Sequence, residues 1–248
     1  MDLASIRVAT FNCEWRRPSS QDAGLIRDRV LAIAPNVVCL TEAHVGYFGD
    51  LGHSITAEAT TLHGPSRRKV LLWSAEPWRE VDTFGSKDFP EGRFVSGTTD
   101  TPLGPLRVVG VCIPYQMAQV RYGEPKRKPW EQHLRYLSAL ANILPSEPKR
   151  TIVMGDFNQA VPRRSQPIRI AEALRTELLD RLAIGTAGLI NPIGRQAIDH
   201  ICFSPDLVPE TPESLSNERE DGRRISDHFG VALRFRDRQF EQGQPLSS

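Results

Sequence analysis

This sequence of 248 residues has few cysteines. It also has almost no net charge and no long apolar run. The four cysteines lie among apolar residues, without the C-x-x-C spacing of zinc sites and redox motifs. They are Cys13, Cys39, Cys112 and Cys202. We therefore expect buried free thiols rather than disulfides or a zinc site, in a reducing and hence cytoplasmic location.

The charges of the chain nearly cancel. Lys and Arg together number 31 and Asp and Glu 30, so the formal net charge is +1. The chain as a whole therefore has no attraction for nucleic acid or an acidic membrane, and an anionic substrate must be bound by local charges. No apolar run is long enough to cross a bilayer, and the first residues lack the apolar core of a secretory signal. We expect no membrane partner.

The length and the hydrophobic content of 40% are sufficient for one sizeable core. We expect a single domain over residues 1–236, followed by a flexible C-terminal tail over residues 237–248. Nothing in the sequence indicates the oligomeric state.

Short apolar, β-branched runs that end in polar residues predict the strands. These runs cover residues 6–11, 37–40, 70–73, 106–113, 152–154, 198–201 and 231–235. Helical spacing of apolar residues occurs over 23–33, 130–144 and 168–182. Because the predicted strands often follow one another directly, we expect mixed sheets with helices packed outside. The segment 204–224 is rich in Pro, Glu and Ser, which predicts a surface excursion.

Polar side chains gather at or next to the ends of the predicted strands. They are Asn12, Glu14, Glu42, Asp156, Asn158, Asp199, Asp227 and His228. Strand ends on one side of a sheet converge on a common face, which predicts one site. This oxygen-rich set suits a hard cation such as Mg²⁺ better than zinc. An amide that binds a phosphoryl oxygen, a carboxylate that takes a proton from water and an imidazolium are the groups that phosphate-ester hydrolysis uses.

Five motifs occur in a familiar order. They are TFNCE (10–14), LTE (40–42), GDFN (155–158), IDH (198–200) and SDH (226–228). In this order they resemble the endonuclease/exonuclease/phosphatase superfamily, which includes deoxyribonuclease I-like and exonuclease III-like enzymes, from about Arg7 to about Phe235. The resemblance implies an α/β fold, a four-layer α/β sandwich in which two mixed β-sheets pack face to face and are flanked by helices. It also implies a metal-dependent phosphoesterase.

The same resemblance implies the metal site. Glu42 of LTE matches the principal Mg²⁺ ligand, and Asn12 of TFN matches an asparagine that helps to hold phosphate and metal. Glu14 and Asp227 match further acidic positions found at the metal site of some members. Mn²⁺ is the alternative ion.

The catalytic residues are implied in the same way. Asp156 of GDFN matches the aspartate that positions or deprotonates the attacking water. Asn158 matches an asparagine that binds phosphate together with Asn12 and His228. Asp199 of IDH matches the carboxylate paired with the catalytic histidine, which is His228 of SDH. A carboxylate beside an imidazole fixes its tautomer and favours its charged form.

The sequence departs from the family pattern at Cys112, where members usually carry a His or Tyr. Because a cysteine thiol has an unperturbed pKa of about 8.5, it does not replace an imidazole as a proton donor without help. Either Tyr115 takes that role, or metal-bound water protonates the leaving group. This leaves the leaving-group step, and with it the substrate class, open.

Basic clusters are the remaining evidence on the substrate. They are Arg16-Arg17, Arg67-Arg68-Lys69, Arg163-Arg164 and Lys126-Arg127-Lys128 with Trp130 beside it. Each alone is typical of a solvated loop, but together they favour a phosphorylated ligand. We expect a phosphodiesterase that acts on nucleic acid or a nucleotide. The alternatives are a phosphomonoesterase on a small sugar or inositol phosphate, and a catalytically silent phosphate-binding module. The remaining histidines, His44, His53, His63, His133 and His200, match no motif and are expected at the surface or behind the site.

Overall fold

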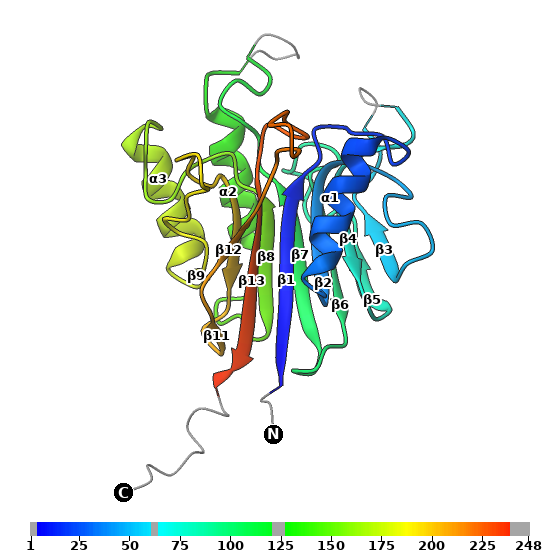
Figure 1. Ribbon diagram of the computed structural model, residues 1–248. Coiled ribbons are helices and arrows are strands. Elements are labelled where there is room, and N and C mark those ends of the chain that lie inside the picture. Colours follow the sequence, from blue (N-terminus) through cyan, green and yellow to red (C-terminus); the bar gives the residue numbers. More distant parts are fainter. Residues whose placement is uncertain (1–3, 61–63, 121–126, 239–248) are drawn as a thin grey trace, which may run out of the picture.

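The apolar runs of the sequence form the central strands of two β-sheets in the computed structural model, which describes residues 4–60, 64–120 and 127–238 (Figure 1). The first sheet has the strand order β11 (Leu207–Pro209), β13 (Gly230–Asp237), β1 (Ser5–Asn12), β2 (Val37–His44), β4 (Arg67–Ser74) and β3 (His53–Thr56), and β12 (Glu213–Leu215) also pairs with β13. The second sheet has the order β5 (Trp78–Asp82), β6 (Phe94–Thr99), β7 (Leu106–Cys112), β8 (Thr151–Asp156), β10 (Asp199–Phe203) and β9 (Ala183–Ile184). Both sheets are mixed, because β1 and β2 run parallel, as do β7 and β8, while their neighbours run antiparallel.

The two sheets pack on each other through a continuous apolar core. Val8 of β1 and Val70 of β4 contribute from the first sheet, and Ile152 and Met154 of β8 from the second. At Gly110 of β7 a β-carbon would lie 2.8 Å from Val70 Cγ1, so the close approach of the sheets requires glycine there.

Helices cover the outer face of each sheet. Helix α1 (Gln21–Ala32) buries Ile26 and Val30 against the first sheet. Helices α2 (Glu131–Ile143), α3 (Ile168–Leu174) and the π-helix η1 (Arg175–Leu179) cover the second, where Tyr136 and Leu140 are fully buried. Burial of each such side chain contributes roughly 1.5 to 3 kcal/mol. The order helix, sheet, sheet, helix confirms the predicted four-layer α/β sandwich.

Several strands lie outside the predicted runs. Strands β3 and β5 are edge strands with mostly exposed side chains, so they have no apolar run to reveal them. The prediction of a surface excursion over 204–224 is wrong in part, because β11 and β12 lie in it and pair with β13. These short strands obtain their backbone hydrogen bonds from a long neighbour and bury single residues such as Leu207 and Leu215.

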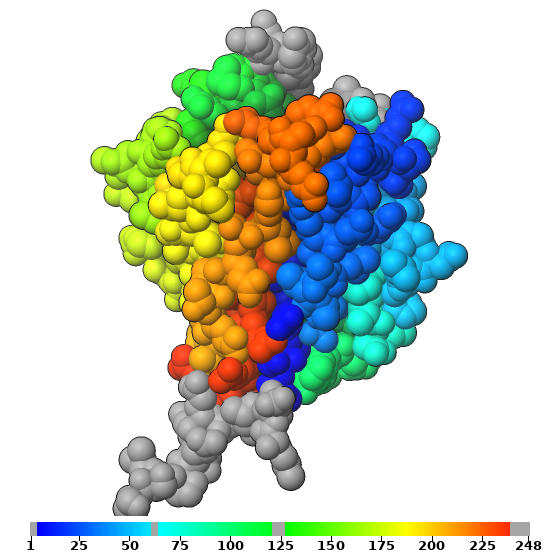
Figure 2. Space-filling view, in the orientation of Figure 1, coloured from blue at the N-terminus to red at the C-terminus, as the bar shows by residue number. Residues whose placement is uncertain are grey.

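The C-terminal part of the segment is also tied down. Figure 2 shows this orange segment lying against α1, in blue. Arg219 forms an ion pair with Asp22 at 2.7 Å, and Arg29 donates to the carbonyl oxygen of Ser216 at 2.7 Å. Strand β13 ends at Asp237, beside the expected domain end at residue 236, and residues 239–248 lie outside the described residues.

No helix among the described residues is long and apolar enough to cross a membrane.

Two of the unassigned histidines lie in the core rather than at the surface. His133 and His200 are fully buried, and burial lowers the pKa of each to about 4 against the opposing effect of one hydrogen bond to a backbone carbonyl. His44 is buried and His53 is exposed, while His63 lies outside the described residues.

The buried His133 predicts a loss of stability in mild acid. Its pKa falls from the ordinary 6.5 to about 4, so below pH 6.5 the unfolded chain binds a proton that the folded chain does not. The stability that depends on neutral His133 therefore falls as the pH falls from about 6.5 to about 4, by roughly 3 kcal/mol in all. Denaturant unfolding of wild type and His133→Asn across this range should show a shallower pH dependence in the variant. An exposed-histidine variant, His53→Asn, serves as the control, and equal pH slopes in all three proteins would contradict the expectation.

The topology brings the predicted polar residues to one end of the sandwich. Asn12 pairs in register with Thr41, beside Glu42, and Asp156 pairs with Asp199 on one side and with Cys112 on the other. This end lies at the top of Figure 1, opposite the end where β1 begins and β13 ends.

Candidate active site

Asp156 ends strand β8 in a strained turn. The preceding Gly155 has φ +140°, and a β-carbon there would collide with the carbonyl oxygen of Val111, so only glycine fits this close approach of β8 to β7. Asn158 follows with φ +53°, a left-handed conformation that Asn tolerates better than most residues. The GDFN sequence therefore supplies the residue types that this turn requires.

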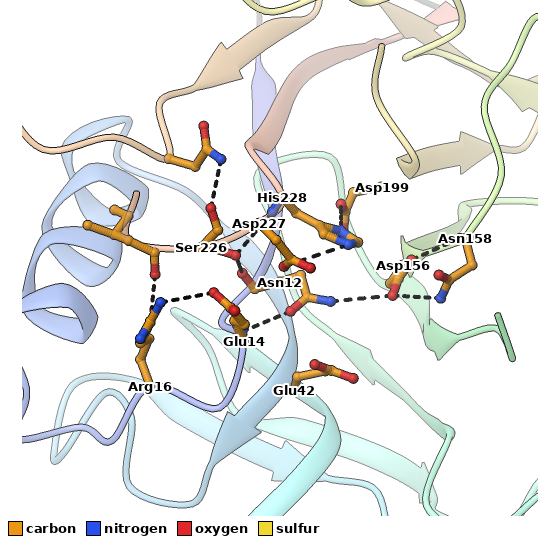
Figure 3. Close-up of polar contacts among 12 residues, drawn as sticks. Asn12, Glu14, Arg16, Glu42, Asp156, Asn158, Asp199, Ser226, Asp227 and His228 are labelled. Carbon is orange, nitrogen blue, oxygen red and sulfur yellow. Dashed lines mark hydrogen bonds and ion pairs between the residues drawn. The ribbon is translucent and has the colours of Figure 1, made fainter. Parts of the chain in front are cut away.

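Asp156 is nearly fully buried and receives three hydrogen bonds (Figure 3). The Asn158 backbone N–H donates to Oδ1 at 2.8 Å, and Asn158 Nδ2 donates to Oδ2 at 2.8 Å. Asn12 Nδ2 also donates to Oδ2, at 3.3 Å. Because Asn158 Nδ2 donates in addition to the carbonyl oxygen of Ile113 at 2.9 Å, both of its hydrogens are engaged. Asn158 thus orients Asp156 in this structure.

His228 and Asp199 form a buried pair. His228 Nδ1 lies 2.6 Å from Asp199 Oδ2, so the predicted contact between these residues is present. The loop before β13 is held by Ser226, whose hydroxyl donates to the Asn12 carbonyl oxygen at 2.6 Å and accepts from the His228 N–H at 3.2 Å. With Nδ1 bonded to Asp199, the Nε2 edge of His228 remains for a ligand, 3.9 Å from Asp227 Oδ1.

The electrostatics of these groups are coupled. Burial raises the pKa of Asp156 to about 7, with the charges of Asp199 and Glu42 adding to it and His228 and the Asn158 N–H opposing it. Burial likewise raises the pKa of Asp199. Burial alone would lower the pKa of His228, but the charge and hydrogen bond of Asp199 and the charges of Asp156 and Asp227 outweigh it and raise this pKa to about 10. His228 is therefore an imidazolium at neutral pH.

Glu42 is paired with a lysine that the sequence analysis placed only in a basic cluster, not at the site. The register of β2 and β4 puts Glu42 opposite Lys69, and Lys69 Nζ lies 2.7 Å from Glu42 Oε1. Lys69 Nζ also lies 4.8 Å from the centre of the Trp15 ring. Although Lys69 belongs to the predicted basic cluster, only its position opposite a carboxylate in the neighbouring strand could have revealed this role.

The two other acidic candidates lie at the margin of the site. The Glu14 N–H donates to Asn12 Oδ1 at 2.9 Å, while its carboxylate pairs with Arg16 Nη2 at 2.9 Å. The Asp227 side chain is 62% exposed. Glu14 thus acts on Asn12 through its backbone in this structure, and Asp227 faces solvent beside His228.

Strained backbone is concentrated around this centre. Nine non-glycine residues of the described ranges have positive φ, and Glu14, Trp15, Glu42 and Asn158 are four of them. Such conformations cost about 1 to 3 kcal/mol each and persist where the surrounding structure enforces them, typically at functional sites.

The relation of the chain to known proteins agrees with this geometry. A sequence model of the Endonuclease/Exonuclease/phosphatase family matches residues 9–228. The chain belongs to the endonuclease/exonuclease/phosphatase family. A comparison with curated proteins gives no match.

Several solved structures share the fold of this protein. An endonuclease/exonuclease/phosphatase from Beutenbergia cavernae is 18% identical, with a TM-score of 0.64, over 94% of this chain and 72% of that one. The 3′ phosphatase NExo from Neisseria, bound to a product DNA hairpin, is 16% identical, with a TM-score of 0.66, over 92% and 98%. A humanized TDP2 from D. rerio is 14% identical, with a TM-score of 0.65, over 93% and 98%. At these identities the likeness shows the deoxyribonuclease I-like fold.

The candidate site of this protein suits a hard cation. Asp156, Asp199 and His228 have ligand atoms within 4.8 Å of one another, and Asp199 Oδ1 is buried without a hydrogen-bond partner among the described residues. The charged His228 has no lone pair to offer, so the ligands available are carboxylates. Burial raises the pKa of the nearby Cys112 to about 12, and this neutral thiol does not attract a soft metal. None of the four residues that the resemblance assigns to the metal belongs to this acidic group.

The Cys112 position has a specific neighbour. Arg93, immediately before β6, donates through Nη1 to the Cys112 carbonyl oxygen at 2.9 Å and lies 3.4 Å from its sulfur. With a pKa of about 12, the thiol is no proton donor to a leaving group at neutral pH.

The Lys69–Glu42 pair leads to a prediction on stability. We expect Lys69→Met to lower the free energy of unfolding in EDTA by about 1 to 3 kcal/mol, because Glu42, only 24% exposed, loses its partner. Millimolar Mg²⁺ should restore part of this loss if a cation takes the place of the ammonium beside Glu42. Thermal unfolding with EDTA and with Mg²⁺ measures both effects. Lys87→Met, which changes an exposed lysine, is the control. An Mg²⁺ effect of the same size in both variants would contradict the idea that a cation replaces the Lys69 ammonium beside Glu42.

Proposed function

We propose that this protein is a Mg²⁺-dependent phosphodiesterase that acts on nucleic acid or a nucleotide in the cytoplasm. The observation that supports it is the meeting of a buried carboxylate, Asp156, with an imidazolium, His228, at one end of the sandwich. Asp199 and Asn158 hold these two groups in place. A silent binding module has no need of this arrangement, so the geometry favours an enzyme.

The side chains divide the work of in-line hydrolysis. Asp156, whose pKa of about 7 suits a general base, takes a proton from the attacking water as the new P–O bond forms. His228 Nε2–H donates to a phosphoryl oxygen and stabilises the negative charge that develops as the bond to the leaving oxygen breaks. Asn12 Nδ2 makes one hydrogen bond in the described residues, which leaves its second hydrogen for the phosphate.

A bound Mg²⁺ would act as a Lewis acid on the phosphoryl oxygens. Glu42 and Asn12, which the resemblance assigns to the metal, are the residues that would hold it; Glu14 and Asp227 would contribute from the margin. Mn²⁺ takes the same oxygen ligands and is the alternative.

The experiment compares bis-p-nitrophenyl phosphate, p-nitrophenyl phosphate and a short single-stranded DNA, each with Mg²⁺, Mn²⁺ and EDTA. We expect cleavage of the diester or the DNA with Mg²⁺, none with EDTA, and recovery when Mg²⁺ is restored. Turnover of the monoester alone would overturn the proposal in favour of a phosphomonoesterase for a small sugar or inositol phosphate.

A further inference from the structure

A large hollow lies beside the catalytic end and continues into it. Its volume is about 530 Å³, and Asn158 forms part of its wall. A smaller hollow of about 220 Å³ contains Asp199 and His228, and the two share Arg164, Gln196 and Ile198. A ligand held at the centre can therefore extend into the larger hollow.

Four segments build the larger hollow, and one of them, which contains Gln196 and Ile198, precedes β10. Residues 115–117 follow β7, Trp130 precedes α2, and residues 158–167 follow β8. Both strands run toward the catalytic end, so the loops that follow them rise from that end in Figure 1.

The aromatic wall is exposed on one side and rigid on the other. Tyr115 is 50% exposed, so its ring is available to a ligand. Trp130 is 8% exposed, its backbone N–H donates to the Gln116 carbonyl oxygen at 2.8 Å, and its ring packs edge-on against His133. A half-exposed ring beside a fixed one suits a planar ligand, because stacking loses little conformational entropy there.

The polar lining is made of amides rather than charges. Arg164 is the one charged side chain among the lining residues, all of which lie in the described part of the chain, and it sits where the two hollows meet. Gln196 Nε2 donates to the Pro162 carbonyl oxygen at 2.8 Å, which leaves its amide oxygen as an acceptor. Gln159 is 2% exposed and neither polar atom of its amide has a partner among the described residues.

The amide atoms of Gln159 are buried, with almost no surface open to the hollow, so Gln196 is the amide that a ligand can reach. Amides offer donors and acceptors side by side, as the edge of a nucleobase does. Gln166 does not contribute, because its Oε1 accepts from the Arg164 N–H at 3.2 Å and its Nε2 donates to the Ala160 carbonyl oxygen at 2.5 Å. Gln166 instead stabilises the loop that follows β8, through these two hydrogen bonds.

We propose that the larger hollow is a nucleobase subsite, which binds the base of the nucleotide whose phosphate lies at Asp156 and His228. The base stacks on Tyr115 and its edge meets the amide oxygen of Gln196. This inference rests on the proposed function, since it requires a phosphate at that centre. It also separates the substrate classes, because an inositol polyphosphate needs several cations and this hollow supplies only Arg164.

The test is equilibrium binding in EDTA, where metal-dependent turnover is absent, measured by calorimetry with adenosine 5′-monophosphate and with ribose 5-phosphate. We expect wild type to bind adenosine 5′-monophosphate about tenfold more tightly than ribose 5-phosphate, in keeping with the energy of stacking one base. Tyr115→Ala, a change at an exposed side chain, should remove most of this difference and leave ribose 5-phosphate binding unchanged. Phe84→Ala is the matched control, since Phe84 is an exposed aromatic residue that lines neither hollow.

Equal affinities for the two probes in wild type, or a preference that survives Tyr115→Ala, would overturn the subsite. The result is independent of the hydrolysis assay. A preference for the nucleotide without diester cleavage would support the subsite and contradict the proposed phosphodiesterase activity. Diester cleavage without the preference would support that activity and contradict the subsite.

Discussion

Replacing Asp156 with asparagine is expected to lower kcat/KM for a phosphodiester by about a thousandfold. The substitution keeps the shape of the side chain but removes the carboxylate that accepts hydrogen bonds from Asn12 and Asn158. In our proposal this carboxylate takes the proton from water. An asparagine amide is not basic, so the water must lose its proton to solvent.

Steady-state kinetics of Asp156→Asn with Mg²⁺ measures this effect, and a thermal melt establishes that the variant folds. Asp88→Asn, which changes an exposed carboxylate between β5 and β6, should keep wild-type activity. An Asp156→Asn enzyme within tenfold of wild type would mean that Asp156 does not handle the proton.

The second large effect is expected at the Asp199–His228 pair. His228→Asn should lower kcat/KM by about a hundredfold to a thousandfold, because it removes the charge that in our proposal stabilises the phosphoryl group. Asp199→Asn should cost less than this, and the double variant no more than His228→Asn alone. Asp199 acts through His228, to which it is bonded at 2.6 Å, so the two effects cannot add.

A second readout separates positioning by Asp199 from a merely structural role. An NMR titration should show a lower pKa for His228 in Asp199→Asn than in wild type, since the charge and hydrogen bond of Asp199 help to hold that pKa at about 10. Wild type, the two single variants and the double variant are compared at one pH and one Mg²⁺ concentration. Strictly additive losses, or an unchanged His228 pKa, would contradict the coupling.

The contacts within the site differ in how far they can be inferred from the sequence. Asp156 and Asn158 are two positions apart after a buried strand, so their contact follows from local chain geometry. Asn12 and Asp156 are separated by 144 positions and His228 and Asp199 by 29. Their proximity was expected because of motif order and because strand ends converge, and the structure gives it an atomic form.

Other contacts had no local signal. Lys69 lies 27 positions from Glu42, and their pairing depends on the register of β2 against β4. The burial of His133 depends on how α2 packs over the second sheet, and the hollow proposed as a nucleobase subsite depends on four segments that meet only in the folded chain. Edge strands β3 and β5 were missed because an edge needs few apolar side chains.

By itself, the sequence determined the interior strands other than β6, the helical spacing, the presence of mixed sheets with helices outside and the set of polar residues at the strand ends. Backbone geometry explains this, because a strand repeats every two residues and a helix every 3.6, and both periods are visible locally. The tertiary structure alone decided which carboxylates are desolvated, which cation neutralises Glu42 and what space lies beside Asn158. Desolvation and pairing depend on neighbours that are distant along the chain, and only packing brings those neighbours together.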